Sequence, residues 1–227
     1  MRSLALFVAL CFFFLYTQLA VADFSQGFSA YEASSFQVAL TEFRKVSRQG
    51  DARAQYMLGR MYQHGYGVVV NNGVAIDYYR MAAEQGHAKA QYTLGVMHQK
   101  GLDLPILQDT VDDSIETGLG PVGAMQGMRT AATHRLGLSY SEAEKWYSLA
   151  ANQGLVEAQY NLGLMYASGA GIPQNYPVAY FWWAVAEGFG NKRAAEKLGI
   201  LKLRMTQNDL AEGIRLTNDW RINHRYR

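Results

Sequence analysis

The chain has 227 residues, a formal net charge of +2 and a hydrophobic fraction of 49%. These values are typical of a folded protein, because disordered chains have fewer apolar residues and a larger net charge. The small net charge also gives no indication of a nucleic-acid partner.

Residues 1–22 have the pattern of a secretory signal peptide, with a positive start, an apolar run over Leu4–Tyr16 and small residues at 20–22. We expect cleavage before Asp23. The alternative is an uncleaved membrane anchor, for which the apolar run is short. The only cysteine, Cys11, lies in this run, so the mature chain would have no disulfide, thiol nucleophile or thiolate metal site. We therefore expect an exported protein, periplasmic or secreted.

Two phrases then recur along the chain. The first, AQYMLG at Ala54–Gly59, returns as AQYTLG at Ala90–Gly95 and as AQYNLG at Ala158–Gly163. The second, YYRMAAEQG at Tyr78–Gly86, returns as WYSLAANQG at Trp146–Gly154. The first two copies of the first phrase begin 36 residues apart and the next two 68, which is 36 + 32. We therefore predict an insertion of about 32 residues, near 102–133.

Both phrases have the spacing of an amphipathic helix, with a glycine turn at 65–67 between them. The residues on the apolar faces are Ala54, Leu58, Met61 and Tyr62 in the first helix and Ala75, Tyr78, Tyr79, Ala82 and Ala83 in the second. One such pair cannot bury its apolar face alone, so we predict that the pairs stack into an α-solenoid.

A glycine follows leucine in each copy of the first phrase, although glycine inside a helix costs about 1 kcal/mol relative to alanine. We expect the bare backbone to let the paired helix approach closely, while large aromatic side chains fill the wider gaps. The glycines are Gly59, Gly95, Gly163 and Gly199. The gap-filling aromatics are Tyr62, Tyr79, Trp146, Tyr166 and Trp182.

The phrases AQYNLGLMYASGAGIPQN at Ala158–Asn175 and AEKWYSLAANQG at Ala143–Gly154 resemble the Sel1-like repeat family, which is related to tetratricopeptide repeats. The resemblance covers essentially all of residues 24–220. It implies an all-α fold, a right-handed superhelical solenoid of antiparallel helix pairs. It also implies an adaptor that holds other proteins, since the family has no common catalytic residue to carry over.

On this basis the chain divides into a signal peptide at 1–22, a solenoid at 23–220 and a basic tail at 221–227. The first unit resembles a shortened repeat with a turn at Ser34-Ser35, and the last helix begins at an N-cap, Thr206, followed by Asp209. The solenoid units are about 24–50, 51–86, 87–154 with the insertion, 155–190 and a capping unit at 191–220.

In tetratricopeptide arrays the first helix of each pair lines a concave groove, and the resemblance places a set of polar and aromatic residues there. This composition suits an extended or acidic peptide. The alternative for the tyrosines is a core position. The candidate groove residues are Arg53, Tyr56, Arg60, Gln63, His64, Lys89, Tyr92, Gln99, Lys100, Glu157 and Tyr160.

No catalytic, cofactor-binding or metal-binding motif is found: there is no Gly-x-Ser-x-Gly, Ser-x-x-Lys, phosphate-binding loop or His-Glu-x-x-His. His98 stands where other copies have tyrosine, which favours a packing role. Asp109, Asp112 and Asp113 in the insertion lack the spacing of a calcium loop and favour a solvated acidic helix face.

We therefore expect an exported, non-enzymatic scaffold or adaptor that binds another protein through its groove. One alternative is a cell-wall-associated factor or hydrolase related to β-lactams or peptidoglycan, and another is a module that docks through the acidic insertion. The stretch 192–227 has nine Lys or Arg and four Asp or Glu, so an acidic partner, an anionic lipid surface or the cell wall would suit it.

Overall fold

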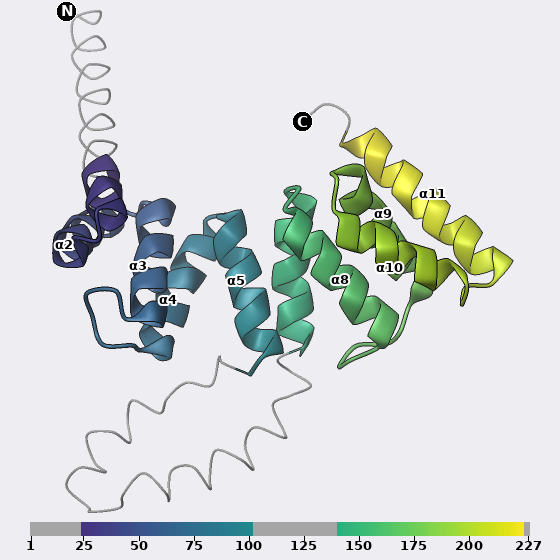
Figure 1. Cartoon of the computed structure of the whole chain (residues 1–227), viewed down its shortest axis with the longest axis horizontal. Helices are drawn as coiled ribbons and strands as arrows, with labels where there is room; N and C mark the ends of the chain where they lie inside the picture. The colour runs from purple at the N-terminus through teal and green to yellow at the C-terminus, as the bar shows by residue number, and fades with distance from the viewer. Residues whose placement is uncertain (1–23, 102–139, 225–227) are drawn as a thin grey trace, which may run out of the picture. The chain divides into compact units, whose positions relative to one another are not determined.

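The computed structural model describes residues 24–101 and 140–224, in which the regular structure is entirely helical (Figure 1). The all-α prediction is thus confirmed for these residues. The chain divides into two compact units, Met1–Ala90 and Gln91–Arg227. The predicted signal peptide at 1–22 and the whole of the predicted insertion at 102–133 lie outside the described residues.

Four helices and the start of a fifth make up the described part of the first unit. They are a helix over 24–32, α2 (Phe36–Ser47), α3 (Ala52–His64), α4 (Asn72–Glu84) and the first residues of α5 (Ala88–Gln99). Asp51 caps α3 by accepting hydrogen bonds from the backbone N–H groups of Arg53 and Ala54. Gly65, at φ 75°, ends α3 in the left-handed conformation that glycine adopts without strain.

The second unit contains the rest of α5, a helix over 140–152, and four further helices. These are α8 (Val156–Ser168), α9 (Tyr176–Gly188), α10 (Lys192–Lys202) and α11 (Gln207–Asn223). Thr206 and Asp209 form a reciprocal capping box at the start of α11, which confirms the predicted N-cap. α9 contacts α8, α10 and α11 (Figure 1).

Contacts between paired helices run in opposite sequence order, so the pairs are antiparallel. In the first unit Gln55 near the start of α3 bonds to Gln85 after α4, while Gly59, further along α3, meets Tyr79, earlier in α4. Each unit has its own buried core. The fully buried side chains include Phe43, Leu58, Met61 and Tyr79 in the first unit and Leu94, Tyr147, Leu162 and Met165 in the second.

Glycine lets an aromatic ring lie on the helix backbone. A Cβ atom added to Gly59 would lie 2.6 Å from the Tyr79 ring, closer than carbon atoms pack. We expected the glycine to bring the two helix backbones together, with aromatic side chains filling gaps elsewhere. Instead, the glycine makes room for an aromatic side chain of the paired helix, which lies directly on it. The equivalent contacts place Gly95 under Tyr147 and Gly163 under Trp183.

The expectation for Gly199 is wrong, because no atom lies within 4 Å of the position that its Cβ would take. α11 packs against α9, and a Cβ atom added to its Gly213 would lie 2.7 Å from the ring of Tyr180. In this last part of the chain the glycine that contacts an aromatic ring is therefore Gly213 of α11, and not Gly199 of α10 as the repeat pattern indicates.

A second contact recurs with the repeat. Gln85 Nε2 donates to Gln55 Oε1 at 2.6 Å, and the equivalent Gln153 Nε2 donates to Gln91 Oε1 at 2.7 Å. In the next repeat the acceptor is Gln159, and the donor position is taken by Phe189. Gln159 is fully buried and its Oε1 has no partner among the described residues, so this repeat lacks a hydrogen bond that the other two have.

Within 24–101 and 140–224, no helix has both the length and the apolar character required to cross a bilayer.

Candidate functional site

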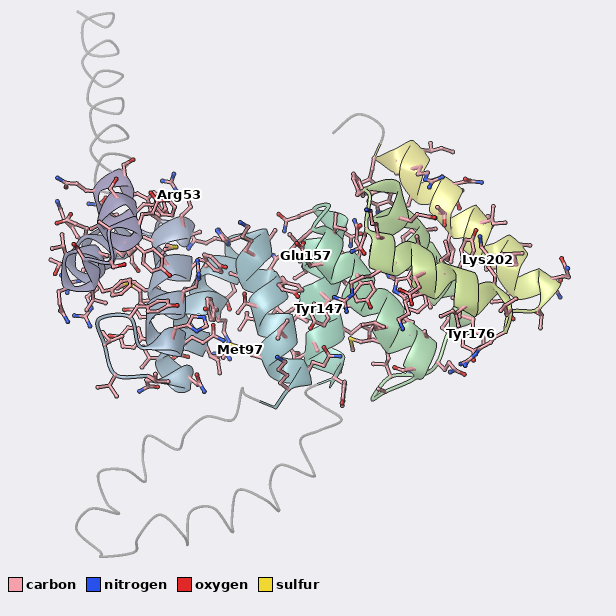
Figure 2. All side chains as sticks on the ribbon, viewed as in Figure 1. Arg53, Met97, Tyr147, Glu157, Tyr176 and Lys202 are labelled. Carbon is pink, nitrogen blue, oxygen red and sulfur yellow. The ribbon has the colours of Figure 1, made fainter. Side chains whose placement is uncertain are left out.

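Two of the predicted groove residues bind side chains of their own repeat. The Tyr79 hydroxyl donates to Gln63 Oε1 at 2.7 Å, and the Tyr147 hydroxyl donates to Gln99 Oε1 at 2.9 Å (Tyr147 is labelled in Figure 2). Burial raises the pKa of both tyrosines, so the phenols stay protonated donors. Gln63 and Gln99 therefore hold the buried tyrosines in place.

Arg53 is also engaged within the chain. Its Nη2 lies 2.6 Å from Asp51 Oδ2, and its guanidinium lies 4.4 Å from the centre of the Phe24 ring. Partial burial opposes ionisation of Asp51, but hydrogen bonds from Arg53 and the Ala54 backbone hold its pKa below the usual range. Arg53 thus supports the cap of α3.

Three of the other predicted residues of the first unit, Arg60, Tyr56 and His64, lie beside half-buried aromatic rings. The Arg60 guanidinium lies 5.6 Å from the centre of the Tyr31 ring. Tyr56 is half-buried and stacks on His87 at 4.7 Å between ring centres. His64 and Lys89 are exposed, and the His64 ring lies 5.4 Å from that of Tyr66.

In the second unit the predicted residues differ in exposure. Tyr160 is only 6% exposed, and Arg193 lies 4.6 Å from its ring centre. Tyr92 is half-buried, with its ring 5.7 Å from that of Tyr147. Lys100 and Glu157 are exposed (Glu157 is labelled in Figure 2).

A pocket of about 280 Å³ lies among α8, α9 and α10 of the second unit. α8 and α10 are the first helices of successive pairs, and α9 is the second helix between them. The pocket is lined by Leu164 from α8, Tyr176 and Trp183 from α9, and Lys197, Ile200 and Arg204 from α10 and the turn after it (Tyr176 is labelled in Figure 2).

The two cations of this pocket have no neighbour that neutralises them. Among the described residues, the side chains of Lys197 and Arg204 have no hydrogen bond, ion pair or ring contact. None of the predicted groove residues lines the pocket. Helical spacing in the sequence could have indicated this cationic surface, because Lys197, Ile200 and Arg204 stand at i, i+3 and i+7 on one helical face.

The first unit has a larger pocket, of about 500 Å³, on its second helices. Arg44 of α2, Arg48 just after α2, and Tyr78 and Met81 of α4 line it, together with Tyr62 of α3. The sequence pattern placed Tyr62 and Tyr78 on the core faces of their helices, but both are half-buried and reach the pocket.

No cluster of three or more metal-ligating side chains is found in the part of the chain that the structure describes. Asp109, Asp112 and Asp113 lie outside it. His98 is 8% exposed, which confirms the predicted packing role.

Comparison with known proteins now identifies the repeat. A family model described as the Sel1 repeat matches residues 52–87, 88–111, 132–155 and 156–186, which together make up half of the chain. The chain belongs to the Sel1 repeat family. The glycine–aromatic contacts and the glutamine pairs described above are thus features of Sel1 repeats in this chain.

Two solved structures resemble this Sel1 repeat chain. A Sel1 repeat protein from Oxalobacter formigenes is 28% identical with a TM-score of 0.60, over 78% of this chain and 60% of that one. A protective antigen of uropathogenic Escherichia coli strains, with an SLR fold, is 28% identical with a TM-score of 0.45, over 89% of this chain and 45% of that one.

Among curated proteins, the chitin synthase regulator SKT5 of Saccharomyces cerevisiae is 43% identical over 58 residues. The match covers 26% of this chain and 8% of the regulator. This Sel1 repeat chain therefore spans less than two thirds of the Oxalobacter structure and a small part of the yeast protein.

Proposed function

We propose that this Sel1 repeat protein is a non-enzymatic adaptor that binds an acidic segment of another protein on the first-helix face of its second unit. The observation that carries the proposal is the pocket among α8, α9 and α10. Its apolar wall can take a side chain, and Lys197 and Arg204 stand beside it without neighbours among the described residues that neutralise them.

The charge of α10 supports an acidic partner. Residues 192–204 contain five Lys or Arg and one acidic residue, Glu196. A surface with such an excess of positive charge steers acidic segments towards it and favours them over basic ones. Apolar side chains next to the cations, such as Ile200 at 46% exposed, add the desolvated contact that gives an interface its affinity.

The family supports an adaptor role in general terms. The yeast relative is a regulator of a synthase, and the match to it falls within a chain built of Sel1 repeats. Residues 24–220 contain no catalytic motif that sequence patterns identify, and repeat arrays present extended surfaces suited to binding.

The test is recovery of partner proteins from cells by purified protein with the pocket charges reversed. Lys197→Glu with Arg204→Glu should abolish enrichment of a specific partner. Lys192→Glu with Lys202→Glu makes the same change of net charge on the same helix outside the pocket, and should leave most of the enrichment. Equal losses in both double variants would contradict a pocket-centred site, and turnover of a peptidoglycan fragment by pure protein would contradict the non-enzymatic role.

We also propose that the protein works outside the cytoplasm, as the pattern of residues 1–22 supports. A fusion of alkaline phosphatase after residue 40 should be active in bacteria, because the enzyme folds only after export. Deleting residues 2–16 should remove that activity. An active fusion without these residues would contradict the proposal.

A further inference from the structure

The pocket on the second helices of the first unit contains a pair of arginines that the adaptor role does not use. The Arg44 guanidinium donates to the Tyr62 hydroxyl at 2.6 Å, and the Tyr62 ring stacks on Tyr78 with 5.8 Å between centres and 17° between planes. Arg48 lines the same pocket, and its side chain has no hydrogen bond or ion pair among the described residues.

Two arginines and the half-buried phenol of Tyr78 line this pocket together. Burial raises the pKa of the Tyr78 phenol, while the nearby positive charges of Arg44 and Arg48 act in the opposite direction. Arg44, Arg48 and Tyr78 all line the same pocket, so a group bound there can meet both guanidinium groups and this phenol. Tyr62 already accepts from Arg44, which leaves its own O–H free to donate.

The arginine pair is a property of this repeat alone. At the two positions equivalent to Arg44 and Arg48, α4 has Arg80 and Glu84, and the helix over 140–152 has Ser148 and Asn152. The stacked pair of Tyr62 and Tyr78 is part of the repeat pattern. The equivalent positions have His98 and Tyr166 for Tyr62, and Trp146 and Trp182 for Tyr78. The two guanidinium groups are not required by that pattern, so packing of the repeat does not explain them.

The net charge of the pocket suits a single negative charge. Two guanidinium groups and one carboxylate, that of Asp77, line the pocket, and Asp77 Oδ1 lies 3.5 Å from Arg80 Nη1. A dianionic phosphate would meet Asp77 at close range with only the two arginines to balance it. Val74, Met81 and the two rings provide an apolar wall next to the arginines, and about 500 Å³ is within the range of ligand pockets.

We infer that this pocket binds a monoanionic carboxylate attached to an apolar or aromatic body. Arg48 and Arg44 bind the carboxylate through charge-assisted hydrogen bonds, the tyrosine hydroxyls orient it, and the body lies against the stacked rings and Met81. The site is formed by α2, α3 and α4 of the first unit and shares no residue with the proposed adaptor pocket among α8, α9 and α10 of the second unit.

The experiment uses N-acetyl-phenylalanine as the probe, with the full chain labelled at its methionine methyl groups with ¹³C. Met81 is 45% exposed in the pocket, whereas Met57 and Met61 are buried in the core of the same unit. Addition of the probe should shift the Met81 signal, identified with a Met81→Leu variant, and leave the Met57 and Met61 signals in place. The primary amide of the probe and inorganic phosphate should shift it little at equal concentration.

Removing a positive or a negative charge from the pocket should change the affinity for the probe in opposite directions. Arg48→Gln should weaken binding of the probe about tenfold or more, because it removes a charge-assisted contact. Asp77→Asn should strengthen binding about twofold, because it removes the negative charge at the rim. Arg204→Gln, the same kind of change in the other unit, should leave the affinity unchanged.

Tripeptides distinguish the two sources of such a carboxylate. If the natural ligand is the C-terminus of a protein, acetyl-Gly-Gly-Phe with a free C-terminus should bind at least as tightly as the single residue, and its amidated form should not bind. If it is a small free acid, only the single residue should bind. Either pattern supports the site, whereas no shift at Met81, equal shifts with the amide, or binding unaffected by Arg48→Gln would overturn it.

Discussion

The Tyr79 hydroxyl donates a 2.7 Å hydrogen bond to Gln63 Oε1, while the Tyr79 ring covers Gly59, which lies one turn before Gln63 on α3. One side chain thus joins α4 to α3 by an apolar contact and a polar one. Tyr147 does the same with Gln99 and Gly95. The repeated glycine and glutamine are therefore parts of one interhelical contact, which contributes to the stability of each helix pair.

Gly59→Ala should lower the free energy of unfolding by about 1–2 kcal/mol. The new Cβ would lie 2.6 Å from the Tyr79 ring, and overpacking of a core costs about 1–3 kcal/mol, which exceeds the helix propensity that alanine gains. Urea denaturation of the two proteins measures the difference.

Gly199→Ala is the matched control, because it makes the same change in a helix where no atom lies within 4 Å. It should raise the free energy of unfolding by about 0.5–1 kcal/mol through helix propensity alone. If both variants changed stability with the same sign, the aromatic contact would not explain the glycine in the first repeat.

Phe189→Gln should raise the free energy of unfolding by about 1 kcal/mol. It places a donor where Gln85 and Gln153 stand in the other repeats, and so gives buried Gln159 Oε1 the hydrogen bond that it lacks. Phe189 is 56% exposed, so little apolar burial is lost. Thermal unfolding followed by circular dichroism measures the gain.

The reverse change, Gln85→Phe, should destabilise the protein by about 1–3 kcal/mol, since Gln55 Oε1 would lose its donor in a buried position. A stabilising Gln85→Phe, or a destabilising Phe189→Gln, would show that the glutamine pairs contribute nothing to the stability of the repeat.

Acid should destabilise the first unit through His87. Burial lowers the pKa of this imidazole, and together with the charges of Lys89 and Arg53 it outweighs a backbone hydrogen bond and the Asp51 carboxylate, which act in the opposite direction. Its Nδ1 accepts a hydrogen bond from the Ala90 N–H at 3.2 Å and its ring stacks on Tyr56. The folded state thus binds a proton at His87 more weakly than the unfolded state does. The contribution of neutral His87 to the free energy of unfolding is therefore complete above about pH 6.5 and is lost as the pH falls below it.

His87→Asn isolates this effect, because asparagine keeps an acceptor at the start of α5 but does not titrate. Denaturation curves at pH 7.5 and 5.5 should show a larger loss for the wild type than for the variant. Equal losses would mean that His87 does not carry the pH dependence.

Much of the repeat could be predicted from the sequence, because the alternation of small and large residues fixes which faces are buried. Ala54, Leu58 and Met61 are fully buried as the helical spacing indicates. The aromatic partners of Gly95 and Gly163 were missed, since Tyr147 and Trp183 stand one residue beyond the tryptophans of the phrase, whereas Tyr79, the partner of Gly59, was predicted only to fill a gap.

The candidate site was harder to predict. Fold analogy assigned groove positions by helix register alone, and register does not show that Gln63 and Gln99 are taken up by tyrosine hydroxyls. The cationic pocket was missed because Lys197 and Arg204 belong to the least typical repeat, where the phrase that guided the comparison has largely been lost.

The most direct test of the adaptor proposal is photo-crosslinking in intact cells from a benzophenone amino acid placed at Ile200, in the pocket among α8, α9 and α10. We expect a defined protein adduct at Ile200 that disappears with Arg204→Glu. We expect no such adduct from Leu149, which is exposed to a similar degree on a second helix. An Ile200 adduct that survives the charge reversal, the same adduct from Leu149, or no adduct at Ile200 would contradict the proposal.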